Sequence, residues 1–198
     1  MSSLDSLLTL LRFTHVFRDV ERNTMIGARR ENDAEHSFQL ALTVWYVAAT
    51  NGMNIDLEKA LKYALAHDLV EAYAGDLSAH ERSAATIRAQ KEREELALGR
   101  IETEFAEFPD LAATIRAYEQ RQDVESKLVY ALDKLLPAAN IYLNSGSTWK
   151  ATDVSLQRLR EMKDDSIGVS DVANGYWEQL RAILEENEAQ LFNPRPQD

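Results

Sequence analysis

The spacing of the apolar residues constrains the fold of this chain more than any other feature of its sequence. Leu40, Val44 and Val47 are an example, because residues three and four apart lie on one face of an α-helix. Runs in which apolar and polar residues alternate, as in a half-buried strand, are hard to find. Only 7 Gly and 4 Pro occur in 198 residues, as expected for a chain with few turns. The sequence therefore predicts an all-α fold built from amphipathic helices.

Capping and breaking residues divide the chain into segments. Asn32 and Glu35 resemble a capping box at the start of one helix, and Asp56 is positioned to cap the next. Gly75 is the expected end of that second helix. The expected helices cover about 4–11, 33–50, 57–74, 83–105, 111–118, 124–139, 154–162 and 172–191, with a polar connector at 18–30 and loops at 76–80 and 144–147. No linker is long enough for a domain boundary, so we expect one domain over residues 1–198. Its core would span about 12–145, and helices at 152–192 would pack on that core.

The composition excludes several classes of site and partner. The chain has no cysteine, so disulfides and thiolate metal ligands are excluded and a metal site must use His, Asp and Glu. The net charge of −11 argues against a nucleic-acid polymer as partner, although a small phosphorylated substrate stays possible. There is no basic N-terminal segment before an apolar run, and no apolar run of membrane-spanning length. We therefore expect a cytoplasmic protein without a membrane partner.

The most informative stretch for chemistry runs from residue 64 to residue 76. His67 and Asp68 are adjacent in the expected helix, and Glu71 follows them by four and three residues. These spacings put Glu71 on the side of the helix that both residues share. One imidazole and two carboxylates then lie on a sector that otherwise carries Leu and Ala. Burial of such groups is costly unless a cation compensates their charge.

Two more polar residues interrupt apolar faces elsewhere in the chain. His36 begins its helix, where the positive end of the helix dipole favours the neutral imidazole that binds metals. Asp133 lies within an apolar segment at 128–136, and Asp is rare in a buried stripe. Taken singly, His36 also fits an ordinary helix-end histidine and Asp133 a hydrogen-bonded buried carboxylate. The pair His67-Asp68 alone also fits a surface position. Together, two His and two Asp form an N₂O₂ set that suits one divalent ion of Mn, Fe, Co, Ni or Zn.

The order of these residues resembles a known signature. His36, then His67-Asp68, then Asp133 is similar to the H…HD…D pattern of the HD superfamily of metal-dependent phosphohydrolases. The string from His67 to Glu71, followed by Gly75-Asp76, resembles a narrower branch that contains the bacterial 5′-deoxynucleotidases. The likeness covers about residues 12–145. It implies an HD-domain helical bundle in which the four ligands meet at the centre.

The resemblance also implies roles for three further residues. By similarity, Glu71 would orient or deprotonate the attacking water, and Asp76 would act as a second acid or base or position the leaving group. Arg22 would match the phosphate-contacting arginine of the branch, with the other arginines of the connector as competitors. The tryptophan beside that arginine in the branch is Asn23 here. Without the resemblance, Glu71 also fits a solvated helix face and Asp76 a turn.

The function implied by the resemblance is hydrolysis of a small phosphorylated substrate. The first choice is a 5′-deoxynucleoside monophosphate, which would give a nucleoside and phosphate. The alternatives are another phosphoester, such as a nucleoside triphosphate or a cyclic nucleotide, and a non-catalytic helical binding module stabilised by its metal. A di-iron oxygenase is disfavoured because only His15 and His80 remain as further histidines. The resemblance to the family implies a homodimer, and the apolar stripe at Val172–Leu191 is the surface that suggests it in this sequence.

Overall fold

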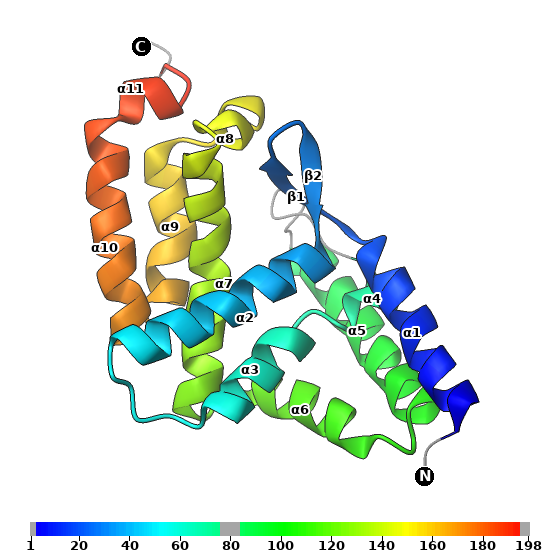
Figure 1. Cartoon of the computed structure of the whole chain (residues 1–198). Helices are drawn as coiled ribbons and strands as arrows, with labels where there is room; N and C mark the ends of the chain where they lie inside the picture. Colours follow the sequence, from blue (N-terminus) through cyan, green and yellow to red (C-terminus); the bar gives the residue numbers. More distant parts are fainter. Residues whose placement is uncertain (1–2, 76–83, 195–198) are drawn as a thin grey trace.

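The computed structural model of the chain describes residues 3–75 and 84–194, and Figure 1 shows its arrangement. Helices dominate it, which confirms the all-α prediction. The elements in chain order are α1 (Leu4–Arg18), β1 (Glu21–Ile26), β2 (Arg29–Asn32), α2 (Asp33–Thr50), α3 (Leu57–Ala66), α4 (Glu71–Ala74), α5 (Ala84–Glu104), α6 (Pro109–Gln120), α7 (Val124–Leu143), α8 (Ser147–Ala151), α9 (Leu156–Ile167), α10 (Asp171–Glu186) and α11 (Glu188–Leu191).

The expected helix caps are present. Asn32 and Glu35 form the reciprocal hydrogen bonds of a capping box at the start of α2. The side chain of Asp56 accepts a hydrogen bond from the backbone N–H of Lys59 and caps α3. Each bond satisfies a backbone donor that has no partner within its own helix. The caps therefore fix the start of α2 and of α3, the helices that carry or precede three of the predicted ligands.

A β-hairpin replaces the polar connector that the sequence predicts at 18–30. β1 and β2 pair antiparallel around a turn in which Gly27 has a φ of 60°. The hairpin carries no apolar alternation because its buried side chains are polar: Thr24 and Glu31 are buried, and Arg22 is nearly so. Hydrophobic periodicity cannot reveal a strand whose inward face is charged. The sequence interpretation described this segment only as a polar connector and missed both strands.

A second difference lies at the most informative stretch. The helix expected at 57–74 is divided, because α3 ends at Ala66 and α4 starts at Glu71. Nδ1 of His67 donates to the carbonyl oxygen of Ala64 at 3.0 Å, and this carbonyl is the one that a continuing α-helix would pair with the N–H of Asp68. Residues 67–70 instead form tight turns, such as the 2.9 Å bond from the N–H of Glu71 to the carbonyl of Asp68.

The main core surrounds α7. Leu128, Val129 and Leu132 of this helix are fully buried against residues of α2, α3, α9 and α10. In Figure 1, α2 crosses in front of α7 while α9 and α10 run beside it. A smaller core joins α1, α5 and α6 through residues such as Phe13 and Ile101. Asp133 projects from the middle of α7 and is therefore held at the centre of the larger packing unit.

The apolar stripe at Val172–Leu191 does not face solvent as the sequence interpretation assumed. Ala173, Trp177 and Leu184 of α10 are fully buried in the core around α7. The indole N–H of Trp177 also donates to Asp164 of α9 at 2.8 Å. The stripe on α10 therefore gives no support for a homodimer. No helix in the described ranges is long and apolar enough to cross a membrane.

Candidate metal centre

The four predicted ligands converge from three separate segments. His36 comes from the first turn of α2, His67 and Asp68 from the turn after α3, and Asp133 from α7. One ligand atom from each lies within 4.8 Å of every other. Nε2 of His36 is 2.9 Å from Oδ1 of Asp133, and Nε2 of His67 is 2.8 Å from Oδ2 of Asp68. The tight turn at 67–70 is what directs two consecutive residues into one site.

Both imidazoles present the same nitrogen to the cluster. The Nδ1–H of His67 donates to the carbonyl of Ala64, which leaves Nε2 facing the carboxylates. For His36, Nε2 faces Asp133 while Nδ1 lies 3.7 Å from Oε2 of Glu31. Metal-binding histidines are usually held this way, with an acceptor behind the nitrogen that does not bind the ion. Nε2 of His67 is buried and has no hydrogen-bond partner of good geometry among the described residues.

The charges of the cluster also favour a cation. Burial alone would favour neutral carboxyls, but the basic groups around them hold the pKa values of Asp68 and Asp133 below their usual range. Burial lowers the pKa of His36. Burial also disfavours an imidazolium at His67, yet Asp68 and Asp133 outweigh it and raise the pKa of His67 to about 10. Without a metal, His67 is therefore protonated, because the carboxylates of Asp68 and Asp133 favour a positive charge beside them.

These residues fit a divalent ion. Two neutral imidazole nitrogens and two carboxylates are a donor set for a first-row transition metal, whereas Mg and Ca prefer oxygen alone. Nζ of Lys134 lies 2.6 Å from Oδ2 of Asp133, so the second oxygen of that carboxylate is neutralised from outside the cluster. Thiolate ligands are absent from the chain, as its composition requires. The cluster could thus hold a divalent metal ion.

Arg22 is the arginine of the hairpin that reaches the cluster. Its Nη1 lies 2.9 Å from Oδ1 of Asp33 and 2.7 Å from Oδ2 of Asp68, and its Nη2 lies 4.0 Å from Oδ1 of Asp133. Burial disfavours its charge, but these carboxylates raise the pKa of Arg22 well above its ordinary value. Arg29, a competitor on sequence grounds, instead forms an exposed ion pair with Glu35.

Glu71 lies at the edge of the cluster. It starts α4, and its carboxylate forms a second close group with Asp33 and Asp68, again within 4.8 Å of one another. It also lines a cavity of about 350 Å³ together with His67, Asp68 and residues of α5 and α6. Asp76, the second predicted acid or base, lies outside the described residues, as does His80.

Two buried acids next to the cluster were missed by the sequence interpretation. Glu31 and Asp33 are fully buried. Burial raises the pKa of Glu31 to about 7, and burial together with the charge of Asp68 raises that of Asp33 to about 6. One feature of the sequence could have indicated them: several acidic residues lie just before His36. The capping box accounts for Glu35 but not for Glu31 and Asp33. Glu31 belongs to strand β2 and Asp33 begins α2, and both side chains lie next to predicted ligands.

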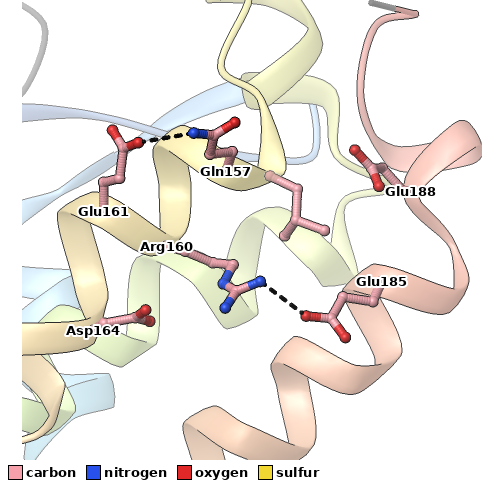
Figure 2. A pocket seen from close by; sticks show the side chains of 7 residues that line it. Gln157, Arg160, Glu161, Asp164, Glu185 and Glu188 are labelled. Atoms are coloured by element: carbon pink, nitrogen blue, oxygen red, sulfur yellow. Dashed lines mark hydrogen bonds and ion pairs between the residues drawn. The ribbon is translucent and has the colours of Figure 1, made fainter.

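A second hollow lies among α9, α10 and α11. Figure 2 shows this hollow of about 550 Å³, which is lined mainly by acidic side chains. Arg160 pairs across it with Glu185 at 3.4 Å, and Gln157 donates to Glu161 at 3.2 Å. It contains no histidine and shares no residue with the cluster. The His/Asp cluster is therefore the candidate functional site.

The fold and the cluster define an all-α protein with a His/Asp cluster that could hold a metal ion. A family model described as an HD domain matches residues 15–172, so the chain belongs to the HD-domain family. The superfamily prediction from the H…HD…D pattern is thereby confirmed. Among curated protein sequences, none matches the chain significantly.

Solved structures resemble the chain over most of its length. A predicted metal-dependent phosphohydrolase from Magnetospirillum magnetotacticum MS-1 is 25% identical, with a TM-score of 0.79 over 98% of this chain and 100% of that one. An HD-domain phosphohydrolase from Listeria innocua is 14% identical, with a TM-score of 0.63 over 92% and 87% of the two chains. A conserved hypothetical protein from Pyrococcus furiosus is 21% identical, with a TM-score of 0.62 over 92% and 99%. The latter two likenesses concern the fold alone.

Proposed function

We propose that this chain is a metal-dependent phosphohydrolase that acts on small nucleotides, with 5′-deoxynucleoside monophosphates as the first choice. One observation carries the proposal: a metal-type donor set and a buried arginine lie side by side, with Arg22 2.7 Å from Asp68. Membership of the HD-domain family and the resemblance to the Magnetospirillum phosphohydrolase support the reaction class. The sequence likeness to the 5′-deoxynucleotidase branch supports the substrate.

Different residues of the chain would have different roles in such a reaction. His36, His67, Asp68 and Asp133 would hold the divalent ion. When bound, the ion would polarise a phosphoryl oxygen and lower the pKa of a water molecule. The guanidinium of Arg22 would neutralise charge that gathers on the phosphoryl oxygens.

Glu71 would take a proton from the attacking water, because its carboxylate borders both the cluster and the adjoining cavity. Asp76 would give or hold a second proton on the leaving-group side. The cavity of about 350 Å³ has the size of a small-ligand site and would receive the nucleoside part of the substrate. Lys91 of α5 and Arg116 of α6 line this cavity among a larger number of carboxylates, so the positive charge for the phosphate would come from Arg22 and the ion.

Phosphate release from a nucleotide panel tests the proposal. Protein reconstituted with Mn, Co, Fe, Ni or Zn is incubated with deoxy- and ribonucleoside monophosphates, nucleoside triphosphates and cyclic nucleotides. We expect phosphate and nucleoside from the deoxynucleoside monophosphates. Products other than phosphate from triphosphates or cyclic nucleotides would identify one of the alternative substrates. No turnover with any metal at high protein concentration would contradict the proposal.

Substitutions at the site and one control separate the catalytic interpretation from the alternative of a metal-stabilised binding module. Glu71→Gln and Arg22→Ala should each lower kcat/KM by about 10²–10³-fold while the fold persists. Glu92→Gln, an exposed residue of α5, is the matched control and should keep wild-type activity. The binding-module alternative predicts instead that Glu71→Gln changes nothing measurable, whereas His67→Ala unfolds the protein.

A further inference from the structure

The two carboxylate oxygens of Asp133 face different partners. Oδ1 lies 2.9 Å from Nε2 of His36, 3.7 Å from Nε2 of His67 and 4.0 Å from Nη2 of Arg22. Oδ2 lies 2.6 Å from Nζ of Lys134, the next residue of α7. The carboxylate is buried, so its oxygens depend on other groups of the protein for partners. Oδ1 therefore faces the His/Asp cluster, whereas Oδ2 is held by an ammonium group.

The ammonium group of Lys134 is directed at this carboxylate rather than at solvent. A lysine on a helix surface normally extends its charged end into water, but the side chain of Lys134 is only 31% exposed. Its Nζ lies 5.2 Å from the ring centre of Tyr130, one helical turn earlier, within the range of a cation–π contact. The guanidinium of Arg121 packs on the same ring at 4.1 Å. Lys134 is therefore held by the ring beside it as well as by Oδ2 of Asp133.

This pairing bears on how Asp133 would bind a divalent ion. A carboxylate binds an ion through one oxygen or through both, and the second mode takes two positions around the ion. A catalytic ion needs positions that the protein ligands leave open, so that water and substrate bind there. If Oδ2 turned to the ion as well, the ion and the ammonium group would compete for one oxygen and repel each other at close range. Lys134 therefore disfavours binding through both oxygens.

We propose that Lys134 is a positioning residue that keeps Oδ2 of Asp133 away from the ion, so that Asp133 would bind through Oδ1 alone and a position beside the ion stays open for a phosphoryl oxygen. The role in admitting a phosphoryl oxygen rests on the proposed function, whereas the role in metal binding needs no substrate. An ion pair that only stabilised the fold would leave the open positions around the ion unchanged when it was broken.

Manganese-loaded protein tests the metal-binding role without turnover. The relaxation rate of water protons reports how many water molecules on the ion exchange with solvent, and inorganic phosphate probes the open position. Lys134→Met removes the ammonium group but keeps most of the side-chain volume, so Asp133 is free to bring both oxygens to the ion. We expect fewer exchangeable water molecules and at least about tenfold weaker phosphate binding, with no loss of affinity for Mn.

Lys127→Met is the matched control for this measurement, because Lys127 is an exposed lysine two turns earlier in α7. It should behave like the wild type. Lys134→Arg keeps a cationic donor and should recover most of the water exchange and phosphate binding. If Lys134→Met does not fold, Lys134→Gln takes its place with the same expected result, since its amide is an uncharged and weaker donor.

Two results with Mn would overturn the proposal. Water exchange and phosphate binding could be unchanged in Lys134→Met, in which case Oδ2 of Asp133 does not need to be held. Alternatively, the affinity for Mn could fall as much as the affinity for phosphate. Lys134 would then support the binding of the ion itself rather than keep a position beside it open.

Turnover tests the part of the role that depends on the proposed function. With the nucleotide identified by the panel, Lys134→Met should lower kcat/KM by about 10–100-fold, and Lys134→Arg should recover most of the loss. Fewer exchangeable waters in Lys134→Met, combined with no hydrolysis by the wild type, would support the role in metal binding while contradicting the proposed function. Equal turnover in Lys134→Met and Lys127→Met would overturn the role of Lys134 in the reaction.

Discussion

Glu31 is a buried carboxylate that supports two residues of the candidate site at once. Its Oε2 lies 3.7 Å from Nδ1 of His36 and 3.8 Å from Nε of Arg22, and this atom has no hydrogen-bond partner within the described ranges. A carboxylate behind a metal-binding imidazole fixes the orientation of the ring and increases its basicity. Glu31 therefore lies where it would orient the imidazole of His36 from behind, on the side away from the His/Asp cluster.

We expect Glu31→Gln to weaken metal binding by about 10–100-fold, because the amide keeps the shape but not the charge behind His36. Competition with a chromophoric chelator measures the affinity directly. Glu35→Gln is the matched control. It precedes His36 in the sequence, but its carboxylate faces Arg29 at the surface, so its affinity should stay within about two-fold of wild type. Equal losses in both variants would show that Glu31 has no special role.

The residues of the site differ in how well the sequence could predict them. His36, the His67-Asp68 pair and Asp133 were predictable because each interrupts an apolar helical face. An ionisable residue is rarely buried on such a face unless it is paired or binds a ligand. Glu31 lies on a hairpin strand whose inward face is polar, so no apolar pattern marks it as buried. Its role depends on a contact between β2 and α2 that only the tertiary structure provides.

At the scale of elements, the N-terminus of α7 determines where Asp133 is held. Asp123 caps this helix, with Oδ1 accepting from the N–H of Ser126 at 2.7 Å. Its Oδ2 accepts from the hydroxyl of Tyr63 at 3.0 Å and lies 2.8 Å from Nζ of Lys59, which ties α7 to α3. The segments that supply Asp133 and the His67-Asp68 pair are therefore joined at their far ends by one carboxylate.

Asp123→Ala should lower the free energy of unfolding by about 1–2 kcal/mol at pH 7, as expected for loss of an N-cap. Partial burial favours protonation, but hydrogen bonds from Lys59, Ser126 and Tyr63 outweigh it and lower the pKa of Asp123 to about 2. The unfolded value is about 3.9. This stabilisation is therefore complete above about pH 4 and is lost as the pH falls through 2.

Urea unfolding of wild type and variant at several pH values measures this effect. The difference between them should shrink steadily from pH 5 toward pH 2. Ser155→Ala is the control, because Ser155 caps α9 with an uncharged hydroxyl that accepts from the N–H of Arg158 at 3.2 Å. Its cost should not depend on pH. A constant difference for Asp123→Ala would mean that its carboxylate charge does not contribute.

Elements with strong apolar periodicity were predictable, and those shaped by single polar contacts were not. The bounds of α2 follow from its capping box and from Asn51-Gly52. At the break between α3 and α4, the ring of His67 bonds the carbonyl of Ala64 and the backbone tightens to i→i+3 bonds, a local change that helix propensity does not register. It is also the feature that brings His67 and Asp68 to the same point, so the least predictable element boundary is the one that forms the site.

At the scale of the whole molecule, the candidate site links parts of the chain that are far apart in sequence. Its ligands come from α2, from the turn after α3 and from α7, the helix around which the main core packs. An ion bound by all three segments has an affinity for the folded protein that the unfolded chain cannot match. Such binding must stabilise the folded state by mass action.

Metal removal should therefore lower the melting temperature. With free metal at about 100 times its dissociation constant, the stabilisation is about 2.7 kcal/mol. In a chain of this size that corresponds to roughly 5–10 °C. Differential scanning calorimetry with excess chelator, then with Mn or Zn added back, measures the shift. His67→Ala should show no metal-dependent shift, because removal of one ligand weakens the ion's hold on the folded state.

His15→Ala is the matched control for this measurement, since His15 is an exposed histidine of α1 that is not part of the cluster. It should retain the full shift. If His67→Ala and wild type gained the same stability from added metal, the ion would bind somewhere other than the His/Asp cluster. A metal-dependent rise in melting temperature only in proteins with all four residues would instead show that the ion binds at the His/Asp cluster. Because these residues come from three segments, the ion then stabilises the packing of α2, α3 and α7 together.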